Sequence, residues 1–399
     1  MIPMAWRDRP GSAPRGFAAA LLVVAAALAP VPAGAAPARS DQQPGPARQG
    51  PGQVAAAGLS TARAPGDPTP ESQWQLDMLR AEEAWELSTG TGQIVAVIDS
   101  GVDARHPDLT GRVLPGRDLV DGSTDGRVDP VGHGTTVAAL IAGRARGGTG
   151  VAGLAPGARI LPVRVLDEQN RYQDARVVAE AVRWAVDAGA SVVTLSLGGA
   201  GASPSLGAAL DYAFAQDVVV IACTGNDLSD RDEQVWYPAR EPGVLAVTGL
   251  ARSPGDGTDA TLWPGAVTGP ETVLAAPAAD LVGARPGGYW RVQGTSFAAP
   301  LVAATAAMIR SEWPRMSAGD VVNRLVSTAQ DLGEPGRDEV YGFGGLDPVA
   351  ALTATVPAVQ RNPLDTNRRH GVAGFGRAPG KAAGAGGAVP DPAYRHRIR

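Results

Sequence analysis

The sequence predicts an α/β protein with three layers, in which helices cover both faces of a mostly parallel central sheet. From Gln73 onward the chain reads as globular for about 280 residues, which is enough for one large core. Short apolar runs alternate with helical stretches there, and this alternation is typical of a parallel sheet between two helix layers. The expected strands are 94–98, 161–166, 192–197, 218–223 and 244–248, and the expected helices are 133–143, 175–188, 205–215, 296–310 and 318–328.

Residues 1–35 predict a secretory signal peptide. Three arginines precede an apolar stretch from Phe17 to Ala29, and Ala33-Gly34-Ala35 supplies an A-x-A cleavage site. The apolar stretch is short and rich in alanine for a membrane span. We therefore expect an exported, extracytoplasmic protein whose mature chain begins near Ala36. An uncleaved N-terminal anchor is the alternative.

Two segments that flank the globular region have the composition of linkers. Residues 36–72 are rich in Pro, Ala, Gly and Gln without apolar periodicity, so they predict a loosely held extension or an extended arm along the domain. Residues 357–399 predict a basic, disordered tail, since eight basic and two acidic residues give 360–399 a formal charge of +6. That tail either makes weak contact with an anionic envelope surface or is simply solvated.

The first expected strand ends in a carboxylate. The run Ile94 to Ile98 has no polar alternation, which indicates a strand buried on both faces of a parallel sheet. Such sheets bind their ligands at the carboxyl ends of the strands, and Asp99 stands at that end. An aspartate that merely starts a turn is the alternative interpretation.

One histidine is placed for chemistry. His133 lies between two glycines on the first turn of the apolar helix 133–143. Of the other three histidines, His370 and His396 lie in the polar tail and His106 precedes Pro107 in an expected loop. His133 is therefore the candidate general base.

A serine begins the helix 296–310. Ser296 follows a tight glycine turn at Gly294, so its hydroxyl is expected at a helix N-terminus, where unpaired N–H groups and the helix dipole favour developing negative charge. A serine that only caps the helix is the alternative. Catalysis by a serine nucleophile needs a base and a third group that orients the base, and His133 and Asp99 fill these roles.

These three segments, in the chain order Asp, His, Ser, resemble those of the subtilisin-like serine peptidases. The resemblance covers about Gln73 to Val356 and implies a secreted endopeptidase that cleaves polypeptides through an acyl-enzyme. It also implies the subtilisin-like version of the three-layer fold for residues 73–356. A Ser/Lys dyad is disfavoured because the single lysine, Lys381, lies in the tail.

The resemblance extends to residues that bind the substrate. Asn226, which follows the apolar run 218–223, matches the asparagine that forms the oxyanion hole with the backbone N–H of Ser296. Ser196, Leu197 and Gly198 match the segment that pairs with an extended peptide. Trp236 precedes a Tyr-Pro pair where these enzymes have a small residue at the bottom of the S1 pocket, so small P1 residues are expected. Alternatively, the preceding loop is reshaped and Trp236 packs elsewhere.

A narrower resemblance is to the mycosins, the peptidases of type VII secretion systems. It is carried by Gln73 to Leu79, by Ala84-Trp85 and by Gly344 to Leu352. It implies processing of exported proteins and association with a type VII secretion machinery. Mycosins usually end in a transmembrane helix and carry disulfides, whereas this chain has no late apolar run and Cys223 is its one cysteine.

No cofactor and no required metal are expected. Asp108 matches a calcium ligand of subtilisins, but Arg144 and Arg146 occupy the loop that would supply the other ligands. No nucleic acid is expected among the partners. Two other functions remain open: a catalytically silent relative that binds peptides in the same cleft, and an exported lipase or esterase, which would need a different order of the triad.

Overall fold

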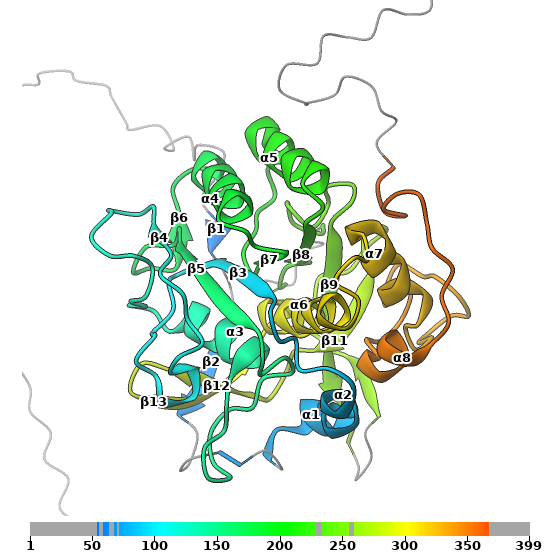
Figure 1. Ribbon diagram of the computed structural model, residues 1–399, viewed down its shortest axis with the longest axis horizontal. Coiled ribbons are helices and arrows are strands. Elements are labelled where there is room, and N and C mark those ends of the chain that lie inside the picture. The colour runs from blue at the N-terminus through cyan, green and yellow to red at the C-terminus, as the bar shows by residue number, and fades with distance from the viewer. Residues whose placement is uncertain are drawn as a thin grey trace, which may run out of the picture. The chain divides into compact units, whose positions relative to one another are not determined.

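The computed structural model describes residues 54–55, 59–63, 68–69, 72–227, 234–254 and 259–366. Their centre is an eight-stranded sheet in the order β10-β9-β8-β7-β3-β5-β4, with β11 paired to β9 beside this path (Figure 1). The strands are β3 (Ile94–Asp99), β4 (Arg117–Asp118), β5 (Arg159–Arg164), β7 (Val192–Leu195), β8 (Val219–Cys223), β9 (Leu245–Arg252), β10 (Ala260–Leu262) and β11 (Leu274–Pro277).

The sheet is mostly parallel, as predicted. Only β10 pairs in the antiparallel sense within it, with β9. In the middle of the sheet, Val95 of β3 lies between Ile160 of β5 and Val192 of β7, and all three side chains are fully buried. Strands covered on both faces have no solvent side that would require polar residues, which explains their uninterrupted apolar sequences.

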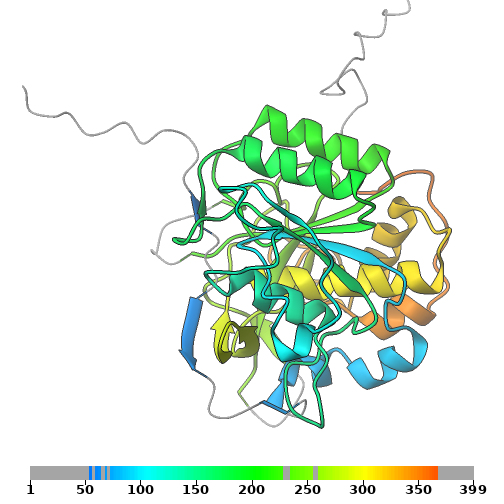
Figure 2. The same cartoon turned by 60° about the vertical axis from the view of Figure 1, so that its left-hand side comes forward.

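Helices cover both faces of the sheet, which confirms the predicted three layers. Figure 2 shows α4 and α5 packed side by side on one face and α3 and α6 on the other. The buried, alanine-rich α6 runs beneath β7, β8 and β9. The helices are α1 (Trp74–Met78), α2 (Ala81–Leu87), α3 (His133–Ala142), α4 (Ala175–Asp187), α5 (Pro204–Ala215), α6 (Thr295–Glu312), α7 (Ala318–Ser327) and α8 (Pro348–Thr353), with a short 3-10 turn η2 (Pro107–Leu109).

A second, three-stranded sheet was not predicted. Strands β12 (Leu281–Arg285) and β13 (Gly288–Gln293) form a hairpin, and β2 (Leu59–Arg63) adds to β13 as an antiparallel strand. Likewise β1 (Val54–Ala55) pairs with β6 (Arg171–Tyr172). Part of the segment 36–72 therefore runs along the domain as an extended arm. Backbone ladders of this kind need no apolar periodicity, which is why the pattern of this segment gives no sign of them. Residues 1–53, with the expected signal peptide, lie outside the described residues.

The domain also continues further toward the C-terminus than composition suggests. The N–H of Val359 donates to the Asp320 carboxylate at 2.7 Å, and the Asn362 amide donates to the Gly243 carbonyl at 2.8 Å. Residues 357–366 are thus bound to the domain, which differs from the disorder expected from 357 onward. Within the stretches that the structure describes, none of the helices has both the length and the apolar character needed to cross a membrane.

Candidate active site

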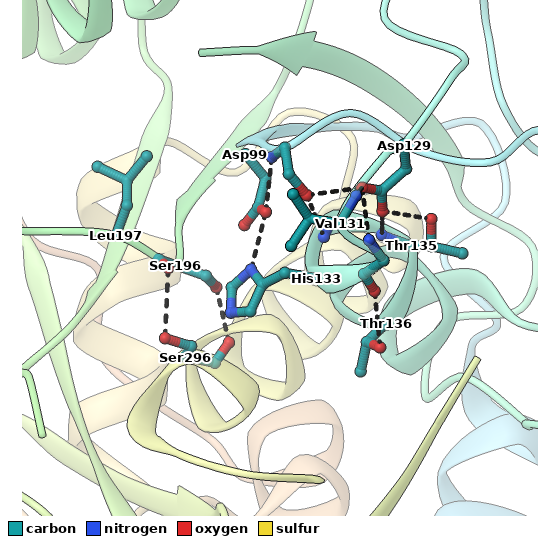
Figure 3. Close-up of polar contacts among 12 residues, drawn as sticks. Asp99, Asp129, Val131, His133, Thr135, Thr136, Ser196, Leu197 and Ser296 are labelled. Carbon is teal, nitrogen blue, oxygen red and sulfur yellow. Dashed lines mark hydrogen bonds and ion pairs between the residues drawn. The ribbon is translucent and has the colours of Figure 1, made fainter. Parts of the chain in front are cut away.

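Asp99 and His133 meet at the carboxyl end of β3. The Asp99 carboxylate and the His133 Nδ1 are 2.8 Å apart, and both side chains are fully buried (Figure 3). The same carboxylate oxygen accepts the N–H of Ser100 at 2.7 Å. A carboxylate acceptor favours the tautomer with the hydrogen on Nδ1, in which Nε2 keeps the lone pair that a general base needs.

Close backbone packing brings these two residues together. Gly134, the second residue of α3, lies so near Gly101 that a Cβ at position 134 would be 2.1 Å from the Gly101 carbonyl oxygen. The same Cβ would be 3.0 Å from Cβ of Asp99. Only glycine fits there, which explains the second glycine beside the histidine.

A third carboxylate, which sequence reasoning missed, ties the two loops together. Asp129 is buried, and its two oxygens accept five hydrogen bonds, from the Ser100 hydroxyl at 2.9 Å, the N–H groups of Val131, Gly132 and Thr135 at 3.0, 2.7 and 2.8 Å, and the Thr135 hydroxyl at 2.6 Å. Burial raises the pKa of the Asp129 carboxyl, and these hydrogen bonds offset part of that effect. Asp129 thus connects the residue after Asp99 to the turn that carries His133. In the sequence, the position of Asp129 four residues before His133 was the one indication of this role.

Ser296 lies on the first turn of α6, next to the segment that follows β7. The Ser196 hydroxyl donates to the Ser296 carbonyl at 2.7 Å, and the Ser296 hydroxyl donates to the Ser196 carbonyl at 3.3 Å (Figure 3). The buried His133 Nε2 has no hydrogen-bond partner among the described residues. The structure therefore joins Asp99 to His133, while the Ser296 hydroxyl is turned toward Ser196. Rotation about one side-chain bond redirects it, and catalytic hydrogen bonds are often absent before substrate binds.

The sulfur of Cys223 lies beside this hydroxyl. Its Sγ is 3.8 Å from the Ser296 Oγ, and the side chain is fully buried at the end of β8. Burial raises the pKa of the Cys223 thiol to about 11. The sulfur is therefore a neutral thiol at physiological pH and does not compete with Ser296 as a nucleophile.

Asn226 is oriented by the residue before the nucleophile. Its Oδ1 accepts the backbone N–H of Thr295 at 2.9 Å and the Thr295 hydroxyl at 3.0 Å. Because the oxygen end of the amide is held there, the nitrogen end is the donor at this site. Thr295 was not among the predicted site residues, and its position directly before Ser296 was the only signal for it.

Trp236 lies between two glycines of the neighbouring segments. A Cβ at Gly225 would be 2.6 to 2.8 Å from three atoms of the indole, and a Cβ at Gly198 would be 3.0 Å from Cβ of Trp236. Gly225 has φ of 115°, a conformation that glycine adopts freely. Backbone hydrogen bonds between Gly199 and Tyr237, 2.7 and 2.9 Å long, fix the segment of Trp236 against the segment Ser196 to Gly198. The buried indole therefore occupies the space between these segments.

Asp108 is engaged by protein donors. It is buried, its carboxylate accepts the N–H of Val151 at 2.8 Å, and burial raises its pKa. The nearby Gly150 carbonyl accepts the Gln73 amide at 3.1 Å. Across the described ranges, three or more histidine, cysteine or acidic side chains nowhere gather in a way that could hold a metal ion.

Comparison with known proteins agrees with this geometry. The model of the subtilase family matches residues 90–344, more than half of the chain. The chain belongs to the subtilase family. By family it is therefore a subtilisin-like serine peptidase of the endopeptidase type.

Among subtilases, the chain is 35% identical to fervidolysin of Fervidobacterium pennivorans over 332 residues, 75% of this chain but only 46% of fervidolysin. It is 33% identical to thermitase of Thermoactinomyces vulgaris over 274 residues, 68% of this chain and 94% of thermitase. Solved structures of similar fold include mycosins. MycP1, described as an essential component of the type VII (ESX-1) secretion system, superposes with a TM-score of 0.64 at 32% identity, over 74% of this chain and 92% of MycP1.

Proposed function

We propose that this subtilase is an exported endopeptidase that hydrolyses peptide bonds through Asp99, His133 and Ser296. The observation that carries the proposal is the buried 2.8 Å bond between Asp99 and His133, with Ser296 at a helix N-terminus beside them. This arrangement orients a base next to a serine hydroxyl in a site closed to bulk water.

In the proposed reaction, His133 Nε2 takes the Ser296 proton as Oγ attacks the scissile carbonyl. The developing oxyanion accepts hydrogen bonds from the Asn226 amide and from the backbone N–H of Ser296. His133 then gives its proton to the leaving amine, and water hydrolyses the acyl-enzyme by the same steps in reverse. Asp99 stabilises the imidazolium that forms during acylation and again during deacylation.

The substrate is proposed to bind as an extended strand along Ser196, Leu197 and Gly198. Backbone pairing of this kind accepts many sequences, so specificity depends on the side-chain pockets. The position of the Trp236 indole between Gly198 and Gly225 supports a small P1 pocket. We infer a preference for Ala, Gly or Ser at P1.

A role like that of the mycosins, the processing of exported proteins beside a type VII secretion machinery, is the narrower proposal. It is supported by the likeness to MycP1 and by a 31% identity to MycP3 of the ESX-3 system with a TM-score of 0.63, over 76% of this chain and 94% of MycP3. The predicted signal peptide supports export. Loss of cleavage of one exported protein in a strain expressing only Ser296→Ala would test this role.

The second candidate function is a catalytically silent peptide-binding protein. It is favoured by one observation, the absence of a bond from Ser296 to His133 among the described residues. A fluorophosphonate probe separates the two functions, because only an activated serine reacts with it. We expect labelling of Ser296 in the wild type and less than about a hundredth of wild-type peptide hydrolysis in Ser296→Ala and in His133→Ala.

Ser311→Ala is the matched control for this experiment. Ser311 lies on the same helix, is half-buried, and its hydroxyl donates to the Thr91 carbonyl. This variant should be labelled and active like the wild type. A wild-type protein that is folded but neither labelled nor active would favour the silent function instead.

A further inference from the structure

Strand β12 is fixed against the first turn of α3. The Thr136 hydroxyl donates to the Ala284 carbonyl at 2.9 Å, and a Cβ at Gly283 would be 2.4 Å from the Thr136 Cγ2. The backbone of β12 therefore lies in direct contact with the turn that begins at His133. Figure 1 shows β12 beside α3.

Arg285, the last residue of β12, extends along the catalytic turn. A Cβ at Gly132 would be 3.0 Å from Cγ and 3.1 Å from Cδ of Arg285. Gly132 directly precedes His133. The stem of the Arg285 side chain thus packs on the backbone next to the catalytic histidine, and its position is set by the contact between β12 and α3.

The guanidinium of Arg285 makes no hydrogen bond or ion pair with any of the residues that the structure describes, and its Nε is buried without a partner. By contrast, Arg291 on β13 pairs with Asp280 at 3.1 Å. Burial lowers the pKa of Arg285, whereas the negative charges of Asp129 and Asp99 raise it. An arginine remains charged in a protein, and the half-buried Arg285 side chain, with its Nε enclosed, finds no acceptor among the described residues.

We propose that Arg285 determines specificity by binding an acidic side chain of the substrate on the leaving-group side of the scissile bond. This inference rests on the proposed function. The segment Ser196 to Gly198 binds the acyl side of the peptide. His133 gives its proton to the leaving amine, so the residues after the scissile bond pass His133 and Gly132.

The chemistry of this position favours a carboxylate. A guanidinium presents paired N–H donors that match the two oxygens of Asp or Glu. Without Arg285, the charges of Asp99 and Asp129 would repel an acidic substrate residue at this edge of the site. With it, an acidic residue at P1′ or P2′ supplies the carboxylate acceptor that Arg285 lacks among the described residues.

The test uses peptides with Ala at P1 that differ only in having Glu, Gln or Lys at P1′ or P2′. For the wild type, kcat/KM for the better Glu peptide should exceed that of its Gln counterpart by about tenfold, as for a hydrogen bond to a charged group. Arg285→Gln should bring this ratio close to one, Arg285→Lys should keep part of it, and Arg285→Glu should favour Lys. Arg291→Gln removes the same charge from the neighbouring strand and should keep the wild-type ratio.

Three results would overturn the proposal: a wild-type ratio near one at both positions, a ratio that survives Arg285→Gln, or a Glu preference that appears only at residues before the scissile bond. The ratio within each variant is independent of the fraction of folded enzyme, so a loss of stability does not mimic the effect. Failure of the proposed function is distinguishable, because the wild type would then hydrolyse none of the peptides, the Gln peptides included.

Discussion

Replacing Trp236 by glycine should change the P1 preference of this enzyme more than any other single substitution that leaves the triad intact. The indole lies against the backbone of Gly225, where a Cβ would be 2.6 to 2.8 Å from three ring atoms. A Cβ at Gly198 would be 3.0 Å from the Cβ of Trp236. A P1 side chain that enters between these glycines meets the ring. Removal of the ring opens that space.

The size of the expected change in P1 preference follows from packing. Forcing a large side chain into a filled site costs roughly 1 to 3 kcal/mol, because neighbouring groups must leave their preferred positions. At about 1.4 kcal/mol for each factor of ten in rate, a P1 Phe peptide should be about tenfold to a hundredfold worse than its Ala counterpart in kcat/KM. In Trp236→Gly the penalty disappears and the additional apolar area buried by Phe should reverse the preference.

The assay compares the two peptides on each enzyme, with active sites titrated by a fluorophosphonate. Trp184→Ala is the control for loss of a large side chain, since Trp184 lies half-buried on α4. Its Phe to Ala ratio should equal that of the wild type. If the wild type already prefers Phe, or if Trp236→Gly leaves the ratio unchanged, Trp236 does not limit the pocket.

Three further predictions concern the surrounding groups. Asn226→Ala should lower kcat by about 10² to 10³-fold, the magnitude measured for the equivalent change in subtilisin itself. KM should change little, because the amide acts mainly on the oxyanion. An unchanged kcat in steady-state kinetics would exclude Asn226 from the oxyanion hole. Asp129→Asn replaces an acceptor oxygen by an NH₂ group that faces at least two donors, so the free energy of unfolding should fall by about 2 to 4 kcal/mol. Denaturant unfolding in a Ser296→Ala background, which prevents autolysis, measures this change. A decrease below about 0.5 kcal/mol would contradict the hydrogen-bond network of Asp129. Since burial raises the pKa of Cys223 to about 11, the thiolate is scarce below that pH. Native protein at pH 8 should therefore not react with iodoacetamide, whereas protein unfolded in guanidinium should. Equal alkylation rates of the native and the unfolded protein, measured by mass spectrometry, would refute the burial of Cys223.

The parallel sheet was predictable because buried strands such as β3 and β8 are read directly from uninterrupted apolar runs. The predicted strand 94–98 and helix 133–143 differ from β3 and α3 by one residue at one end. The hairpin β12 and β13 was missed because Gly288–Gln293 is half-buried and mixes aromatic with charged residues. Its strands are defined by backbone pairing with each other and with β2, which leaves no periodic signal.

At the site, residue types and order made Asp99, His133 and Ser296 the candidates, since few side chains can perform those steps, and the structure brings Asp99 and His133 into contact. The supporting groups were less accessible. Asp129 and Thr295 act through hydrogen bonds to backbone N–H groups and to one amide oxygen, and apart from their nearness to His133 and Ser296 nothing distinguishes them from turn and helix-cap residues. Arg285 was not singled out because a β-strand arginine is usually paired or solvated, and the sequence does not show that its side chain packs on Gly132.

The contact between Gly134 and Gly101 has a consequence for heat inactivation. The two backbones approach so closely that the aspartate and the histidine cannot separate unless α3 leaves β3, and both belong to the buried centre of the domain. Partial opening of surface loops, the thermal fluctuation of lowest free energy, therefore leaves the hydrogen bond between Asp99 and His133 in place. The temperature at which catalysis ceases is then set by cooperative unfolding of the whole sheet and not by an early failure of the reactive centre.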